Sequence, residues 1–136
     1  MNIEGQILII EDHSALRILM SNFLRKSFFV KTSADGYEAL AWMNEGNIPD
    51  IIILDINMPN LGGIEFLNNI RISGIFHDVP VVVVSGEEKG EIIEKCLNIG
   101  INGYMKKPFN PIVLQSKIRS ILKNRNGKTL FQLSSS

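Results

Sequence analysis

Polar side chains that could bind a metal ion or take part in a reaction follow four short apolar runs of this chain, at the point where each run ends. Three carboxylates brought together there would repel one another and resist ionisation unless a cation joined them. Oxygen ligands without a nearby His or Cys favour Mg²⁺ or Mn²⁺ over zinc. The residues concerned are, in chain order, Glu11 and Asp12, Asp55, Ser85, and the doublet Lys106 and Lys107.

A structural role is the alternative for each acidic residue taken singly. An aspartate after a buried strand often caps a helix or forms a turn, and Asp12 is a candidate cap for a helix that begins near Ser14. Taken jointly, three carboxylates at one edge are harder to explain in that way and predict a cation site. His13 and His77 are expected at the surface, because neither stands in a ligand pair such as HExxH.

The two adjacent lysines cannot both reach the same site. Neighbouring residues of a strand point to opposite faces, so one of Lys106 and Lys107 is expected in solvent. Pro108 restricts the residue before it and allows a cis peptide bond. We therefore expect Lys107 to approach the carboxylates.

The elements that must position these residues alternate along the chain. Short runs rich in Ile and Val predict strands that are covered on both faces, and the segments between them have the apolar spacing of helices. Such alternation predicts parallel strands with right-handed crossovers in an open, doubly wound sheet. Ligands of such sheets bind at the carboxyl ends of the strands. The expected strands are Ile7–Ile10, Phe28–Val30, Ile51–Leu54, Val81–Val84 and, more weakly, Tyr104–Met105.

Five apolar stripes define the expected helices. The fourth helix should stop near Gly100, and the fifth should open with Asn110 as its N-cap and Pro111 in its first turn. After Lys123 the periodicity is lost, which indicates a frayed tail. The stripes are Leu16, Leu19, Met20, Phe23 and Leu24; Ala39, Leu40 and Met43; Ile64, Leu67 and Ile70; Ile93, Cys96 and Leu97; and Leu114, Ile118, Ile121 and Leu122.

Four motifs together resemble the receiver domain of two-component response regulators, the chemotaxis-type single-domain fold. They are the pair Glu11-Asp12, the stretch LDINMPNLGG, the segment VVVVSG and the turn GYMKKPF. The resemblance runs from about Gln6 to Lys123. It implies a flavodoxin-like (βα)5 sandwich with a five-stranded parallel sheet in the order 2-1-3-4-5. It also implies a receiver domain over 1–124 and a C-terminal tail, disordered or frayed, over 125–136.

The resemblance assigns a role to each site residue. Asp55 resembles the phosphoacceptor, Lys107 the lysine before the proline, Ser85 the switch hydroxyl and Tyr104 the switch aromatic. Mg²⁺, for which Mn²⁺ can substitute, would be held by the metal ligands of the family, which match Glu11, Asp12, Asp55 and the main-chain carbonyl of Asn57. Glu11 stands where Asp is commoner and still supplies a carboxylate. Asn57 and Glu87, two residues past Asp55 and Ser85, are expected to influence the lifetime of the phosphoryl group.

The resemblance further implies a phosphorylation-controlled signalling switch, with weak self-phosphorylation and self-dephosphorylation, and not a turnover enzyme. The phosphoryl donor would be a phosphohistidine on a sensor histidine kinase or a histidine phosphotransfer protein. The switched surface would be the fourth helix, fifth strand and fifth helix, Gly90 to Lys123, which would bind an output protein or domain. The alternative function is a receiver fold that serves as a phosphorylation-independent interaction module.

Three other classes of protein fit the sequence less well. A P-loop NTPase needs GxxxxGK[ST], which does not occur in the chain. A dinucleotide-binding module needs GxGxxG after the first strand, where EDHSAL stands instead. A phosphatase of the haloacid-dehalogenase type has a second aspartate where this chain has Asn57, and a cap domain for which the chain has no room.

Composition places the chain among ordinary globular domains. At 136 residues with 45% hydrophobic residues it has the size of one domain. Its formal net charge of +0 favours neither nucleic acid nor an anionic membrane as a partner. Cys96, the single cysteine, is expected to be buried and inert, which fits a reducing compartment. The first apolar run is too short for a signal peptide or a membrane span. We expect a cytoplasmic protein that is a monomer or a weak homodimer.

Overall fold

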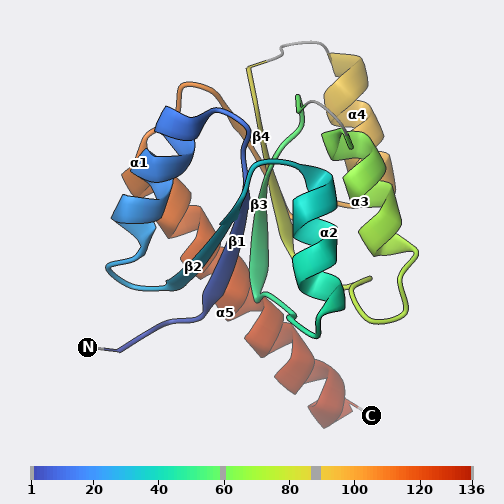
Figure 1. Cartoon of the computed structure of the whole chain (residues 1–136). Coiled ribbons are helices and arrows are strands. Elements are labelled where there is room, and N and C mark those ends of the chain that lie inside the picture. The colour runs from blue at the N-terminus through green and yellow to red at the C-terminus, as the bar shows by residue number, and fades with distance from the viewer. Residues whose placement is uncertain (1, 59–60, 87–89, 136) are drawn as a thin grey trace.

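Parallel strands form a central sheet in the order β2-β1-β3-β4-β5 (Figure 1). The coordinates are a computed structural model, which describes the chain apart from residues 1, 59–60, 87–89 and 136, and describes side chains as far as Arg125. The strand order predicted from the family resemblance is confirmed. The strands in the described residues are β1 (Gln6–Ile10), β2 (Phe29–Ser33), β3 (Ile51–Asp55), β4 (Val81–Ser85) and β5 (Gly103–Lys106).

Helices cover both faces of this sheet and make a three-layered domain. Helices α1 and α5 lie on one face, and α2, α3 and α4 lie on the other (Figure 1). This arrangement confirms the doubly wound α/β fold class. The helices are α1 (Ser14–Leu24), α2 (Gly36–Asn44), α3 (Gly63–Arg71), α4 (Gly90–Ile99) and α5 (Pro111–Ser135).

Alternation along the strands divides the core into two halves. In β1, Ile7 and Ile9 pack with α1 and α5, whereas Leu8 and Ile10 pack with α2, α3 and α4. Strands β3 and β4 are buried along their whole length. Fully burying one such side chain contributes about 1.5–3 kcal/mol, so the three central strands hold the sheet rigidly. The carboxyl ends of these strands are therefore fixed points.

The edge strand β2 differs from its prediction in bounds and in burial. It spans Phe29–Ser33 and not Phe28–Val30, and Phe29 is 63% exposed. Strand β2 pairs only with β1 in the sheet, because it lies at the edge. The expectation that all strands are covered on both faces is wrong for this one.

Two leucines of the predicted apolar stripes lie in solvent. Leu19 of α1 is 59% exposed and Leu97 of α4 is 61% exposed, whereas Met20, Leu24 and Cys96 are buried. A helix contacts the sheet along a narrow strip, and residues at the margin of an apolar stripe fall outside it. The stripe predictions are correct for the centre of each helix face and wrong at these two margins.

The cap of α5 is the one that the sequence predicts, and the cap of α1 decides between the two roles considered for Asp12. Asn110 caps α5, since its side-chain oxygen accepts a hydrogen bond from the Ile112 amide at 2.8 Å. The cap of α1 is His13, whose Nδ1 accepts from the Leu16 amide at 3.3 Å, and not Asp12. The carboxylate of Asp12 is thus not used to cap the helix.

Helix α5 is longer than the sequence indicates. It continues to Ser135, well beyond Lys123, where the apolar periodicity ends. Because side chains are described only to Arg125, the division into a receiver domain, 1–124, and a tail, 125–136, stays a prediction. Among the described residues, no helix has both the length and the apolar character needed to cross a membrane.

Candidate functional site

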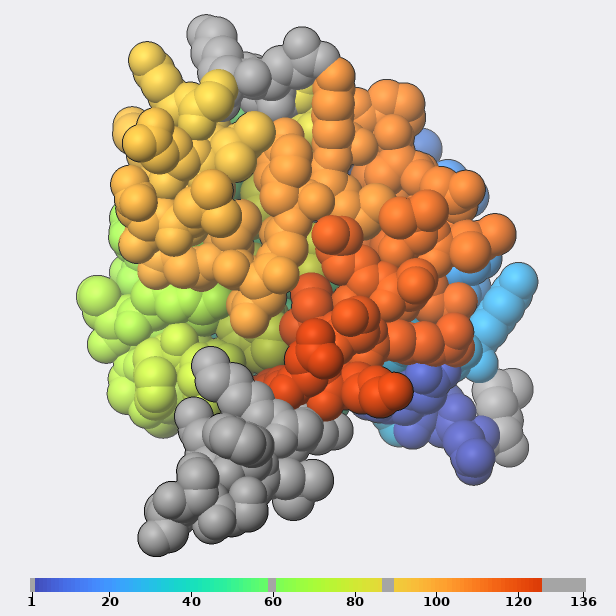
Figure 2. Space-filling view, turned by 180° about the vertical axis from the view of Figure 1, so that it is seen from behind, coloured from blue at the N-terminus to red at the C-terminus, as the bar shows by residue number. Residues whose placement is uncertain are grey.

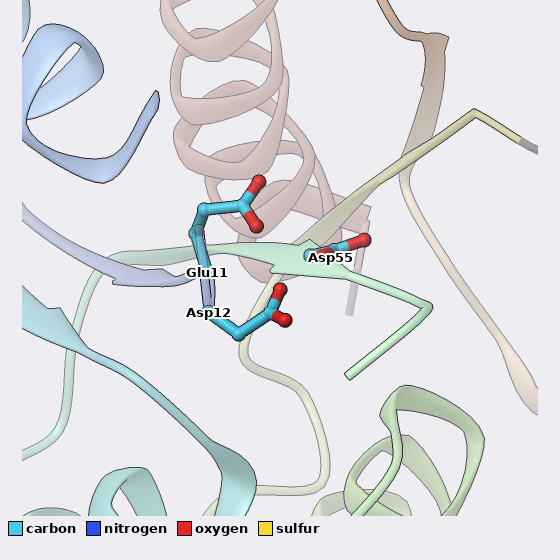
Figure 3. A group of neighbouring side chains, drawn as sticks. All are labelled: Glu11, Asp12 and Asp55. Atoms are coloured by element: carbon cyan, nitrogen blue, oxygen red, sulfur yellow. The ribbon is translucent and has the colours of Figure 1, made fainter. Parts of the chain in front are cut away.

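Three carboxylates meet at the carboxyl edge of the sheet (Figure 3). The register pairs Ile10 of β1 with Leu54 of β3, so the residue that follows each of them lies at the same edge. Glu11 and Asp55 are buried and Asp12 is exposed, and one carboxylate oxygen of each lies within 4.8 Å of the others. The strand ends thus bring together the acidic residues that the sequence singles out.

Lys107 joins this cluster as a cation. Its Nζ lies 2.7 Å from Glu11 Oε1 and 3.4 Å from Asp55 Oδ2. Its amide donates to the Ser85 carbonyl at 2.8 Å, which ties the end of β5 to the end of β4. The peptide bond from Lys107 to Pro108 is cis. Lys106 is exposed, so one lysine of the doublet lies in solvent, as strand alternation predicts, and Lys107, the residue before Pro108, is the one that reaches the carboxylates.

Lys107 does not compensate all of the negative charge. Burial, and after it the neighbouring Glu11 carboxyl, raises the pKa of Asp55 to about 7, against the lowering effect of Lys107 and of the Asn57 amide. Burial lowers the pKa of Lys107, but the hydrogen bonds and charges of Glu11 and Asp55 outweigh it and raise that pKa overall. Two buried carboxyls that share one ammonium leave a deficit of positive charge.

The donor set fits a small, hard divalent cation. Each of the three carboxyls offers an oxygen to a common point, and such oxygen ligands suit Mg²⁺ or Mn²⁺. The exposed Asp12 leaves room for the water molecules that Mg²⁺ usually retains. An added cation would also offset the two causes that raise the pKa of Asp55, burial first and the neighbouring Glu11 carboxyl after it.

The loop after Asp55 turns tightly against the site. The Asn57 amide donates to Asp55 Oδ1 at 3.1 Å. At Gly63, a Cβ atom would lie only 2.6 Å from the Ile56 Cα and 2.9 Å from the Asp55 carbonyl oxygen. Glycine is therefore required where α3 begins, because any side chain would push the loop and the Asp55 main chain apart. The metal-ligand role of the Asn57 main-chain carbonyl stays a prediction.

The two switch candidates lie on neighbouring strands. Ser85 ends β4 and is 1% exposed. Tyr104 lies in β5, is half-buried and packs against the core half that includes α4. The register places Tyr104 beside Val83, two residues before Ser85. Glu87, expected to influence the phosphoryl lifetime, lies outside the described residues.

Arg17 is a contact of the acidic loop that sequence reasoning missed. From the second turn of α1 its Nη1 donates to the carbonyl oxygens of Glu11, at 2.8 Å, and Asp12, at 3.3 Å. The available signal was an arginine about one and a half helical turns after the acidic pair. Such a residue is normally assigned to a solvated helix face, which is why it carried no prediction.

Known proteins resemble this chain in sequence and in fold. The sequence model of the response regulator receiver domain matches residues 7–119. Chemotaxis protein CheY of Pseudomonas aeruginosa is 37% identical over 124 residues, which are 90% of this chain and 99% of that protein. The structure of chemotaxis protein CheY4 of Vibrio cholerae has a TM-score of 0.80 at 30% identity and covers 86% of this chain and 98% of its own. A CheY-like receiver domain protein of Methanospirillum hungatei has a TM-score of 0.83 at 27% identity, over 90% of this chain and 97% of its own. The matched segment, 7–119, contains all three carboxylates and Lys107.

Proposed function

This chain belongs to the response regulator receiver domain family, and on that premise we propose that it takes a phosphoryl group onto Asp55 and acts as a signalling switch. The donor is a phosphohistidine on a sensor histidine kinase or a histidine phosphotransfer protein. The observation that carries the proposal is the position of Asp55, buried at the end of β3 with two carboxylates within 4.8 Å and Lys107 at 3.4 Å.

Asp55 acts as the nucleophile. One of its carboxylate oxygens forms a bond to phosphorus while the phosphorus–nitrogen bond of the phosphohistidine breaks, and the departing imidazole nitrogen keeps the electron pair of that bond. Asp55 Oδ1 is held by the Asn57 amide, and a fixed nucleophile has less freedom to lose on reaching the transition state. A rigid strand end is the right support for this step.

Receiver domains bind Mg²⁺ through acidic residues, and here these are Glu11, Asp12 and Asp55. With the main-chain carbonyl of Asn57, these residues would hold Mg²⁺, for which Mn²⁺ substitutes. When bound, the ion supplies the positive charge that allows two buried carboxyls and an anionic phosphoryl group to lie side by side.

Lys107 supplies the second positive charge. In the structure its ammonium lies between Glu11 and Asp55, within reach of a phosphoryl oxygen attached to Asp55. An ammonium placed where charge gathers during phosphoryl transfer lowers the barrier. The same site takes up the phosphoryl group and slowly hydrolyses it from Asp55, so the protein is a switch with weak catalytic activity.

The new charge then changes the surface around α4, β5 and α5. A phosphoryl group adds close to two negative charges and strong acceptors, which attract the Ser85 hydroxyl and draw the loop after β4 toward the site. Tyr104 turns inward as that loop moves. Helices α4 and α5 form much of the face seen in Figure 2. Leu97 of α4 and Ile112 and Val113 of α5 are 61%, 65% and 50% exposed, and apolar side chains of this kind contact an output protein or domain.

We propose that this switch acts in the cytoplasm. We propose a monomer or weak homodimer without direct binding of nucleic acid or membrane.

The test is the intact mass of the full chain after incubation with acetyl phosphate and Mg²⁺. We expect a phosphoryl adduct that requires Mg²⁺, is absent from Asp55→Asn and is kept by Asp78→Asn, a matched control at an exposed aspartate. Absence of the adduct from the wild type, with Mg²⁺ binding shown separately, would overturn the proposal and favour the phosphorylation-independent interaction module.

A further inference from the structure

Arg17 holds the main chain of the two residues that supply carboxylates from the loop after β1. Its Nη1 donates to both consecutive carbonyls, Glu11 at 2.8 Å and Asp12 at 3.3 Å. The arginine is itself fixed in α1, where its amide donates to the His13 carbonyl at 3.0 Å. A single side chain thus joins the acidic loop to the body of α1.

The two acidic side chains differ in how they are held. The Glu11 carboxylate is buried, lies against Lys107 and accepts from the His13 amide at 3.2 Å. The Asp12 carboxylate is exposed, and the described residues give it neither a hydrogen bond nor an ion pair. Its direction is therefore set by the main chain on either side of it, which is the part of the loop that Arg17 contacts.

We propose that Arg17 is a positioning residue for the metal site: it fixes the peptide groups of Glu11 and Asp12 so that the Asp12 carboxylate faces Asp55. The inference rests on the proposed function, since it names what organises that site. Groups that orient metal ligands typically contribute about 10-fold to 100-fold to metal affinity. The effect is expected on the affinity for the ion and not on the chemistry of Asp55.

The guanidinium is suited to this task in a way that an ammonium is not. Its planar group reaches two adjacent carbonyl oxygens in a fixed geometry, whereas the ammonium of lysine is a single point charge on a flexible stem. Substitution by lysine therefore keeps the charge near the carboxylates but loses part of the orientation. The two variants separate a positioning role from a purely electrostatic one.

The experiment measures Mg²⁺ affinity of the metal-free full chain by titration calorimetry, in the wild type, Arg17→Gln, Arg17→Lys and Arg25→Gln. Arg25, an exposed arginine just after α1, is the matched control for loss of one positive charge. We expect about 10-fold weaker binding in Arg17→Gln, an intermediate affinity in Arg17→Lys and no change in the control. Mn²⁺ should give the same order.

A second readout separates positioning from a general structural defect. The Mg²⁺ concentration that gives half-maximal uptake from acetyl phosphate should rise in Arg17→Gln by the same factor as the dissociation constant. The rate at saturating Mg²⁺ should stay within about twofold of the wild type, because the affinity is the property that Arg17 is proposed to set. Should Arg17→Gln fail to fold, Arg17→Lys supplies both measurements.

Wild-type Mg²⁺ affinity in a folded Arg17→Gln or Arg17→Lys would overturn the inference, as would equal affinities of Arg17→Gln and Arg25→Gln. Full affinity with a lower saturated rate would overturn it too. Failure of the proposed function is a different result, namely no adduct in the wild type, and the affinity comparison among the four proteins holds independently of it.

Discussion

At the carboxyl edge of the sheet, Glu11 and Asp55 are buried beside the partly exposed ammonium of Lys107, and the pKa of Asp55 is raised to about 7. The opposite end of the sheet, where the strands begin, is called the amino edge here. There the half-buried Arg71 donates to three main-chain carbonyls, those of Val79 at 2.7 Å, Gly100 at 2.9 Å and His77 at 3.2 Å. The charge at the amino edge is met by hydrogen bonds, whereas the charge at the carboxyl edge is left in excess.

This difference separates a part of the molecule that stabilises the fold from a part that is arranged for binding. Arg71 joins the end of α3 to the segments that precede β4 and β5, so its contacts hold the frame. The carboxylates destabilise one another until a cation or a change of protonation relieves them. Ionisable groups with strongly shifted pKa values are found most often at functional sites.

The largest effect is expected from removing the ammonium at the carboxyl edge. Lys107→Ala should slow phosphoryl uptake from acetyl phosphate by about tenfold or more, because a positive charge at the reacting group is lost. The matched control, Lys106→Ala, removes the exposed neighbour and should keep the wild-type rate. Equal rates in the two variants would show that Lys107 has no role in phosphoryl uptake.

The next effect concerns stability at the amino edge. Arg71→Leu should lower the free energy of unfolding by about 2–4 kcal/mol, since three carbonyls lose hydrogen bonds from a charged donor. Denaturant titration measures this change. The variant should bind Mg²⁺ with wild-type affinity. A changed affinity would show that the amino edge also contributes to binding, contrary to the division of roles described above.

The last effect, the smallest when taken per pH unit, is a pH dependence of stability that arises at Asp55. Its folded pKa of about 7 lies above 3.8, the usual value for an aspartate, so the folded state binds the proton more tightly than the unfolded state. The contribution is present below about pH 4 and is lost as the pH rises toward 7. Without metal, stability should therefore fall across this window by at most about 1.4 kcal/mol per pH unit.

Asp55→Asn has no such ionisation and should lose this slope while becoming more stable than the wild type near pH 7. Chemical unfolding at several pH values in a chelator measures both proteins. A wild-type slope that survives unchanged in the variant would show that another group is responsible. Saturating Mg²⁺ should stabilise the wild type more than the variant, because the ligand binds the folded state.

Much of the fold followed from patterns that are local in the chain. The runs at Ile7–Ile10, Ile51–Leu54 and Val81–Val84 are strands because their side chains suit burial on both faces, and their polar ends meet because parallel strands end at one edge. Lys107 was separated from Lys106 by strand alternation together with the proline that follows it. These inferences need only the period of a strand, the direction of the sheet and the restriction that a proline imposes on its neighbour.

The remainder depends on contacts between segments distant in the chain. The exposure of Leu19 depends on how far α1 is rotated against the sheet, and that of Phe29 on the edge position of β2. Arg17 and Arg71 bind main-chain carbonyls, which every residue has, so no residue type in the sequence marks their partners. The His13 cap was missed because histidine is an uncommon N-cap and Asp12 stood beside it.

The central claim is that Asp55, the buried carboxyl group at the carboxyl edge, accepts the phosphoryl group. The most direct measurement treats the phosphorylated chain with borohydride, which reduces an aspartyl phosphate to homoserine, and locates the product by peptide mass spectrometry. The account predicts homoserine at position 55 and at no other aspartate, only when Mg²⁺ was present during phosphorylation. Homoserine at position 12, or a phosphoryl group that borohydride leaves untouched, would contradict it.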